Sequence, residues 1–375
     1  MRTDRRSILA AGLGGACALA APAFAQQRGR GGRDGADADA DGPPLRDRTA
    51  RKGLLYGVAL QTRHLTDPPL AEAAAREANL LVPEYEAQWR IIHPEPQRYD
   101  YRAIDRLEAF AREHRMQFRG HSLVWHLLMA QWIQGAIATR AGAERTLVEH
   151  ITTVVGHTKG RAHSWDVVNE AIDDGNPEMR RTPWFNALGA DYIDIAFRTA
   201  RQADDRVLLS YNEYGIQHGD ANSDRKRAAV LRLLEGMRRR NVPVDALGVQ
   251  SHLSAGLPFD EQKFRRFIGE VAGMGLKVFI SELDVRDRDL PGDADPRDRA
   301  VAELTRRFLD AALDERAVKV VVTWGVSDRH SWLNDVANSR RTDGQPVRGL
   351  PLDDRMARKP MWRAMAAAFD AAPAR

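Results

Sequence analysis

Short apolar runs alternate with amphipathic stretches of helical period from Gly53 onward. Each apolar run has the length of a buried strand, and each stretch between them repeats its apolar residues as a surface helix does. The predicted strands are Leu54–Leu60, Asn79–Pro83, Gln117–His121, Ser164–Asn169, Val207–Tyr211, Ala246–His252, Lys277–Leu283 and Lys319–Trp324. The predicted helices are Ala71–Ala78, Tyr101–His114, Glu144–Gly156, Tyr192–Gln202, Asp224–Arg239, Glu261–Ala272, Ala300–Leu313 and Pro360–Phe369. This alternation predicts an α/β chain with one closed (β/α)8 barrel, a TIM barrel, rather than an open doubly wound sheet.

The N-terminal 50 residues do not share this pattern. Residues 1–25 begin with three arginines, continue with an apolar stretch and end in Ala23-Phe24-Ala25, which is typical of an export signal peptide and its cleavage site. The Arg5-Arg6 pair resembles a twin-arginine signal, and an ordinary secretory signal with a basic start is the alternative. Residues 26–50 contain one aliphatic side chain larger than Ala, so we expect a disordered Gly/Arg/Asp-rich leader. The sequence therefore predicts an exported protein, periplasmic or extracellular, with a single catalytic barrel at residues 51–372.

Composition and charge narrow the possible partners. Removal of residues 1–25 takes away three Arg and one Asp, which lowers the formal net charge from +4 to +2, and it removes the single cysteine. Disulfides, cysteine–zinc sites and thiol nucleophiles are then excluded, and the balanced charge gives no reason to expect nucleic acid. No phosphate-binding glycine motif follows a predicted strand, and the histidines form no H-E-x-x-H set. We therefore expect no cofactor, no metal, no membrane partner after signal removal, and a monomer.

Polar and aromatic side chains follow the predicted strands, at the end where a barrel of this kind forms its active site. Two glutamates, Glu170 and Glu282, follow the fourth strand and end the seventh. The other side chains at these ends are carboxylate, amide, imidazole and aromatic groups: Glu84, His121, Trp125, Asn169, Asn212, Tyr214, Gln250, His252, Asp284, Trp324 and Trp332. Flat aromatic faces stack on pyranose rings, and amide and carboxylate groups bind hydroxyls. This set predicts a binding site for a polysaccharide or oligosaccharide.

Four segments carry a resemblance to a known family. They read GHSLVWH at 120–126, WDVVNE at 165–170, ISELDV at 280–285 and TWGVSD at 323–328, the last followed by SWL at 331–333. Together they closely resemble the motifs of glycoside hydrolase family 10, the barrel xylanases, and the resemblance runs from about Tyr56 to Trp362. It implies a retaining endo-β-1,4-xylanase with Glu170 as acid/base and Glu282 as nucleophile.

Hydrolysis with retention of the anomeric configuration requires two carboxyl groups placed in this way. At a separation of about 5–5.5 Å the second carboxylate can attack the anomeric carbon directly and form a covalent glycosyl-enzyme. Repulsion at that distance, with an effective dielectric near 20, is about 3 kcal/mol or about 2 pKa units, so one carboxyl stays protonated as the acid. When Glu282 becomes an uncharged ester the repulsion vanishes, and Glu170 can then serve as the base.

The resemblance also implies roles for the surrounding side chains. It assigns the support of the ionised nucleophile to His252 and Asp284. It assigns substrate binding to Glu84, His121, Trp125, Asn169, Tyr214, Gln250, His252, Trp324 and Trp332. Among these, Asn169 would bind the 2-hydroxyl of the sugar being cleaved, the two C-terminal tryptophans would wall that sugar, Glu84 would contact the next sugar, and Tyr214 would stack on the leaving side. A tryptophan taken alone is more often core, as we expect for Trp89, Trp132, Trp184 and Trp362.

The chain departs from the family pattern at one subsite. The segment after the second strand is close to T-P-E-N-E-M-K-W in the family and reads VPEYEAQW here, so Tyr85 and Gln88 replace an asparagine and a lysine. After the third strand, Leu128 stands where the family usually has glutamine. Three hypotheses stay open: an endo-β-1,4-xylanase, a hydrolase of the same mechanism acting on decorated xylan or another β-glycoside, and a non-catalytic glycan-binding barrel. Retention of both glutamates argues against the third.

Overall fold

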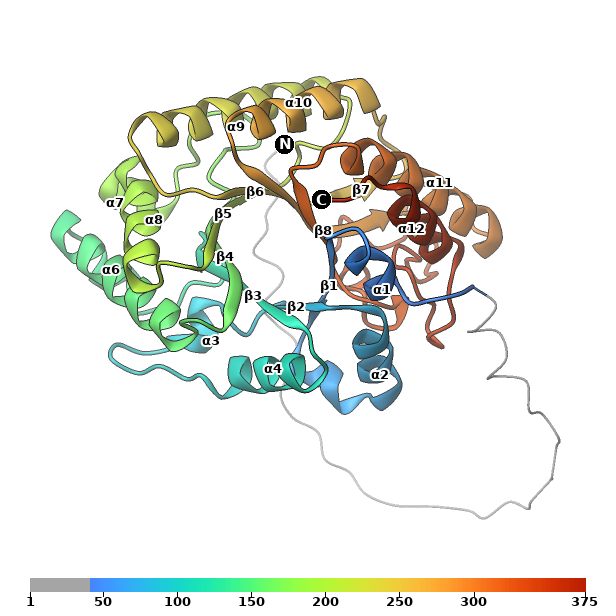
Figure 1. Cartoon of the computed structure of the whole chain (residues 1–375). Helices are drawn as coiled ribbons and strands as arrows, with labels where there is room; N and C mark the ends of the chain where they lie inside the picture. The colour runs from blue at the N-terminus through green and yellow to red at the C-terminus, as the bar shows by residue number, and fades with distance from the viewer. Residues whose placement is uncertain (1–40) are drawn as a thin grey trace, which may run out of the picture.

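The computed structural model describes residues 41–375, in which parallel strands close into a barrel surrounded by helices (Figure 1). The sheet order is β6-β5-β4-β3-β2-β1-β9-β8, and β6 also pairs with β8, which closes the ring. The strands are β1 Leu55–Leu60, β2 Leu80–Pro83, β3 Gln117–Val124, β4 Ala162–Asn169, β5 Leu208–Glu213, β6 Ala246–Val249, β7 His252–Ser254, β8 Lys277–Arg286 and β9 Val318–Thr323. The predicted (β/α)8 barrel is confirmed.

The long helices lie outside the barrel, between successive strands (Figure 1). The α-helices are α1 Leu45–Ala50, α2 Pro68–Glu77, α3 Trp89–Ile92, α4 Arg102–Glu113, α5 Ile133–Ala136, α6 Arg140–His157, α7 Pro183–Leu188, α8 Asp191–Ala203, α9 Ala221–Arg239, α10 Glu261–Gly273, α11 Ala294–Leu313 and α12 Pro360–Ala371. Short 3-10 helices are η2 Thr62–Thr66, η3 Asp328–His330 and η4 Trp332–Asn334. All eight predicted strands and helices are present with shifted ends, and the short helices α1, α3, α5 and α7 were not predicted.

Two sequence predictions need correction. The predicted strand Ala246–His252 is divided into β6 and β7, because Ser251 has a positive φ of 62° that takes the chain out of the ladder. The leader does not extend to Ala50, because Leu45–Ala50 forms α1. Leu45 is fully buried and its N–H donates to the Glu77 carboxylate at 3.1 Å. One buried leucine together with specific hydrogen bonds fixes this otherwise polar segment to the barrel. The export signal and the rest of the leader lie outside the described residues.

The buried residues form two separate clusters. The larger one fills the layer between the barrel and the outer helices. The smaller one lies inside the barrel and comprises Ala59, Leu80, Val82, Ala246, Phe279, Val320, Val322 and Trp324. A packed interior is typical of this fold. It leaves no room for a ligand inside the barrel, so the candidate polar residues lie at the carboxyl ends of the strands.

Candidate active site

Glu170 directly follows β4, and Glu282 lies within β8. A chain of amide hydrogen bonds connects their carboxylates. Gln250 Nε2 donates to Glu170 Oε1 at 3.2 Å and to Asn169 Oδ1 at 3.3 Å. Asn212 Nδ2 then donates to Asn169 Oδ1 at 2.9 Å and to Glu282 Oε1 at 2.7 Å. The two glutamates singled out in the sequence therefore belong to one polar cluster.

The second oxygen of Glu282 faces His252. His252 Nε2 lies 3.1 Å from Glu282 Oε2, and its Nδ1 lies 2.9 Å from Asp284 Oδ1. Burial alone would lower the pKa of His252, but the carboxylates of Asp284 and Glu282 raise it to about 9. Trp332 Nε1 donates to the other Asp284 oxygen at 2.6 Å. At neutral pH the His252 imidazolium can therefore donate to Glu282 Oε2 and to Asp284 Oδ1 at the same time.

Glu170 has a different electrostatic environment. Burial raises its pKa, and the nearby carboxylates of Glu213 and Glu282 raise it further, while Trp125 and Gln250 lower it in part. The two carboxyls thus have different electrostatic surroundings: Glu282 contacts the His252 imidazolium, whereas the raised pKa of Glu170 favours its protonated form.

His121 is held from below by a buried ion pair that the sequence did not predict. Its Nδ1 donates to Asp166 Oδ2 at 3.0 Å, and Asp166 also accepts from Arg119. Burial would raise the pKa of Asp166, but the Arg119 guanidinium and His121 lower it. Burial lowers the pKa of His121, while Asp166 and Glu282 raise it above its ordinary value. Charged residues inside apolar strand runs were the available signal for Arg119 and Asp166.

Asn212 is the second residue whose role sequence reasoning missed. Besides its bonds to Asn169 and Glu282, its Oδ1 accepts from Ser281 Oγ at 2.6 Å. Space for this amide exists because residue 248 on the neighbouring strand β6 is a glycine: a Cβ there would lie 2.1 Å from Asn212 Oδ1. Its position at a strand end placed it among the candidates, but spacing gave no hint of its partners.

The aromatic candidates surround this cluster. Trp324 is buried and packs edge-on against His121 with ring centroids 5.2 Å apart, and Trp332 lies 5.0 Å from His252. Tyr214 directly follows β5 and is half-buried, and its hydroxyl accepts a hydrogen bond from Arg180 at 3.0 Å. Trp89, Trp184 and Trp362 are buried at 1% exposure, as expected for core residues, and Trp132 is partly exposed.

Glu84 lies beyond β2 with the residues that depart from the family pattern. It is buried, and burial raises its pKa to about 7, helped by the nearby Glu86 carboxylate and opposed in part by Gln61, Arg63 and Tyr85. Its Oε1 has no hydrogen-bond partner in the described chain. Gln88 is also buried, and its Nε2 donates to the His121 carbonyl at 3.3 Å. This amide is therefore packed against β3 rather than displayed on an open wall, and it connects the Glu84 segment to the cluster.

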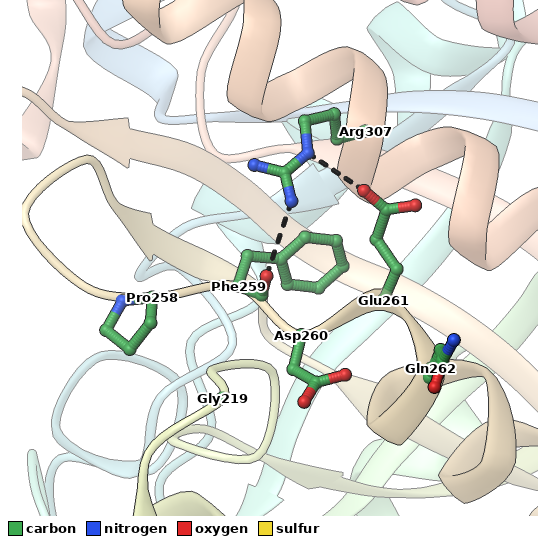
Figure 2. A pocket seen from close by; sticks show the side chains of 7 residues that line it. All are labelled: Gly219, Pro258, Phe259, Asp260, Glu261, Gln262 and Arg307. Carbon is green, nitrogen blue, oxygen red and sulfur yellow. Dashed lines mark hydrogen bonds and ion pairs between the residues drawn. The ribbon is translucent and has the colours of Figure 1, made fainter.

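A cavity of about 500 Å³ occurs elsewhere, between the β5–α9 connection and the start of α10 (Figure 2). It is lined by Gly219, Pro258, Phe259, Asp260, Glu261, Gln262 and Arg307. Figure 2 shows Arg307 directed to Glu261 and to the Phe259 carbonyl, at 2.8 and 3.4 Å. None of the paired carboxyls or indoles lines this cavity, so we place the active site at the polar cluster instead.

No group of three or more His, Cys, Asp or Glu side chains within residues 41–375 is arranged to hold a metal ion. No helix in the same range is both long and apolar enough to cross a membrane.

Comparison with known proteins agrees with the four motifs. A sequence profile of glycosyl hydrolase family 10 matches residues 44–368. The chain belongs to this family. Among curated family 10 relatives, endo-1,4-beta-xylanase B of Thermotoga neapolitana is 34% identical over 263 residues, which cover 70% of this chain and 74% of that protein. Xylanase 10B of Thermotoga maritima has a TM-score of 0.81 at 32% identity, over 87% of this chain and 98% of that one. Xylanase 10B of Thermotoga petrophila RKU-1, solved in complex with xylobiose, has a TM-score of 0.81 at 32% identity, over 87% and 97% of the two chains.

Proposed function

We propose that the protein is a retaining endo-β-1,4-xylanase that hydrolyses xylan by double displacement. The observation that carries the proposal is the unequal environment of the two carboxyls: Glu282 contacts the imidazolium of His252, and burial raises the pKa of Glu170. The curated relative above is named an endo-1,4-beta-xylanase, and one solved neighbour is a xylanase in complex with xylobiose. Family membership and the two environments together support this reaction.

In the first step the ionised Glu282 attacks the anomeric carbon while Glu170 donates its proton to the leaving oxygen. Asn212 and His252 each hold one oxygen of the nucleophile, which fixes the direction of attack. In the second step Glu282 is an ester and carries no charge. One cause of the raised pKa of Glu170 is then absent, so Glu170 loses its proton more readily and activates water.

The test compares two variants. Glu282→Ala should abolish turnover even on activated aryl β-glycosides, because no other carboxylate can form the glycosyl-enzyme. Glu170→Ala should spare the first step when the leaving group needs no proton, and added azide should then give a β-glycosyl azide. NMR detection of inverted products from the wild type, or full activity of Glu282→Ala, would contradict the proposal.

A second candidate is a hydrolase of the same mechanism that prefers decorated xylan or another β-glycoside. Tyr85 and the buried Gln88 favour it, because they replace an amide and a cation that would bind hydroxyls of the second sugar on the non-reducing side. Initial rates on xylo-oligosaccharides, arabinoxylan, glucuronoxylan, β-glucan and aryl β-glycosides would separate the two. The preferred substrate in that panel decides between them.

We also propose export through the twin-arginine route, which rests on the Arg5-Arg6 pair in the sequence. Replacement of both arginines by lysine should leave precursor in the cytoplasm. Normal secretion of the double variant would indicate the general pathway instead.

A further inference from the structure

The backbone that carries Glu170 is strained. Strand β4 ends at Asn169, and Glu170 has a φ of 59°, in the left-handed region that side chains other than glycine rarely adopt. Such conformations persist when the surrounding structure holds them, and they are common at active sites. The direction of the Glu170 side chain therefore depends on what fixes the backbone of residues 170–172.

The N–H groups of these three residues are all bonded to β5. Glu170 N donates to the Asn212 carbonyl at 2.9 Å. Ala171 N donates to the Tyr211 hydroxyl at 3.2 Å, and Ile172 N to Glu213 Oε2 at 3.1 Å. One side of the segment is thus held by three consecutive residues of a barrel strand.

The carbonyl groups of the same three residues are all bonded to one residue, Arg180. Its Nε donates to the Glu170 carbonyl at 3.0 Å, and one Nη to the Ile172 carbonyl at 2.8 Å. Its own backbone N–H donates to the Ala171 carbonyl at 2.7 Å. The planar guanidinium can serve two carbonyls at fixed angles, which a lysine ammonium cannot do.

We propose that Arg180 is a positioning residue that holds Glu170 in the orientation needed for proton transfer, an inference that rests on the proposed function. Arg180 does not bond to the reacting carboxyl. It fixes the carbonyl of Glu170 itself and the carbonyls of the two residues that follow. Loss of the guanidinium would leave two carbonyls without donors and free the segment to relax from its left-handed conformation.

Arg180 also connects this segment to the leaving side of the site. The Nη that reaches the Ile172 carbonyl donates to the Tyr214 hydroxyl at 3.0 Å, and it lies 3.4 Å from Asp174. The Lys226 ammonium lies 3.6 Å from the centroid of the Tyr214 ring and so covers one of its faces. A sugar on the leaving side can stack only on the other face. Arg180 therefore contacts both Tyr214, on which that sugar would stack, and the backbone of Glu170, the proposed acid that protonates the leaving oxygen.

The test uses Arg180→Met and Arg180→Lys with two substrates. Xylotetraose needs a proton on its leaving oxygen, whereas 2,4-dinitrophenyl β-xylobioside does not. For Arg180→Met we expect kcat/KM to fall about 100-fold on xylotetraose and to stay within about threefold on the aryl glycoside, because only general acid catalysis is misaligned. Arg180→Lys should lose about tenfold on xylotetraose, since its ammonium is a single-point donor. Azide should raise turnover of the aryl glycoside by Arg180→Met, because the base for the second step is misaligned too.

Arg181→Met is the matched control, because Arg181 is exposed in the same segment and its guanidinium stacks over Phe185. It should behave as wild type on both substrates. Equal losses of Arg180→Met on both substrates would show a merely structural role, and no loss on either would show that Arg180 is dispensable; both results overturn the inference. Glu170→Ala is measured alongside: if it shows no dependence on the leaving group, the proposed function fails rather than the role of Arg180.

Discussion

Glu282 and Glu84 are buried to nearly the same degree, with 4% and 5% of their surface exposed, yet their surroundings differ completely. Glu282 receives a hydrogen bond from Asn212 and faces the imidazolium of His252. Glu84 keeps one buried oxygen without a partner in residues 41–375, and burial raises its pKa to about 7. At nearly equal burial, both oxygens of Glu282 therefore have partners, whereas Glu84 has side-chain donors in Gln61 and Tyr85 but keeps its Oε1 unbonded among the described residues.

This contrast divides the site into two regions. At the proposed reacting centre, protein side chains contact both oxygens of Glu282 and one oxygen of Glu170, which agrees with a geometry fixed before substrate binds. Around Glu84 the protein leaves acceptors open, because Gln88 Oε1 is also buried without a partner in the part of the chain that the structure describes. Hydroxyl groups are donors that could satisfy both oxygens. The departures from the family pattern lie in this second region only.

The first prediction removes a donor from the complete region. Asn212→Ala should lower kcat/KM about 100-fold or more on both xylotetraose and activated aryl glycosides, because the nucleophile acts in either case. Formation of the glycosyl-enzyme, measured as the burst of released aryl leaving group, should slow by the same factor. Asn186→Ala, on the exposed surface of α7, is the control. A variant that folds normally and keeps more than about a tenth of the rate would show that His252 alone suffices.

Much of the first region could be predicted from the sequence. Apolar runs with polar ends gave the barrel and brought Asn169, Glu170 and Glu282 to one face, because the strands are parallel and end on the same side. Asn212 was visible at a strand end, but its bonds to Ser281 and Glu282 depend on the close approach allowed by Gly248. Arg180 lies in a loop, where spacing carries no information about which carbonyls a side chain will reach.

The segments that sequence patterns did not reveal are held by specific polar contacts. Helix α1 has one aliphatic residue larger than Ala, so its hydrophobic pattern predicted no fold, yet Arg46 donates to the Ala75 carbonyl and Leu45 N to Glu77. The same holds at Gln88, which the sequence placed on a subsite wall and the structure buries against β3. Periodicity reports apolar faces and gives no account of single hydrogen bonds.

The second prediction restores polar groups to the second region. The triple variant Tyr85→Asn, Gln88→Lys, Leu128→Gln should gain about 10- to 100-fold in kcat/KM on xylotetraose relative to a substituted oligosaccharide, because each hydroxyl bond contributes about 0.5–1.5 kcal/mol. Leu128 and Tyr85 are partly exposed, so these two replacements can reach a bound sugar directly. Gln88 is buried, so a lysine at position 88 must leave the contact with the His121 carbonyl to do the same. If the wild type cleaves xylotetraose as well as the triple variant does, the three differences are neutral.

The last prediction concerns the pH dependence of stability at Glu84. Its pKa is about 7 in the folded protein, against an ordinary value of 4.5, so between pH 4.5 and 7 the folded state binds more protons than the unfolded state. Stability should then fall as pH rises through this range, by up to about 3 kcal/mol from this group alone. Glu84→Gln carries no charge at any pH and should remove that loss. Relative to wild type, its free energy of unfolding should therefore rise between pH 4.5 and 8, as measured by urea denaturation at each pH.

Glu86→Gln is the matched control for this measurement. Glu86 is equally buried, but its Oε1 accepts from Thr62 N at 2.6 Å and from Thr62 Oγ1 at 3.0 Å. Replacement of this carboxylate by an amide weakens two hydrogen bonds that the folded protein makes, so it should cost stability and should give no gain at high pH. If Glu84→Gln follows Glu86→Gln instead, with stability lost at pH 8, then Glu84 is already supported in the free enzyme. The contrast between Glu84 and Glu282 would then be one of degree, and the second region would have no need of hydroxyl donors from the substrate.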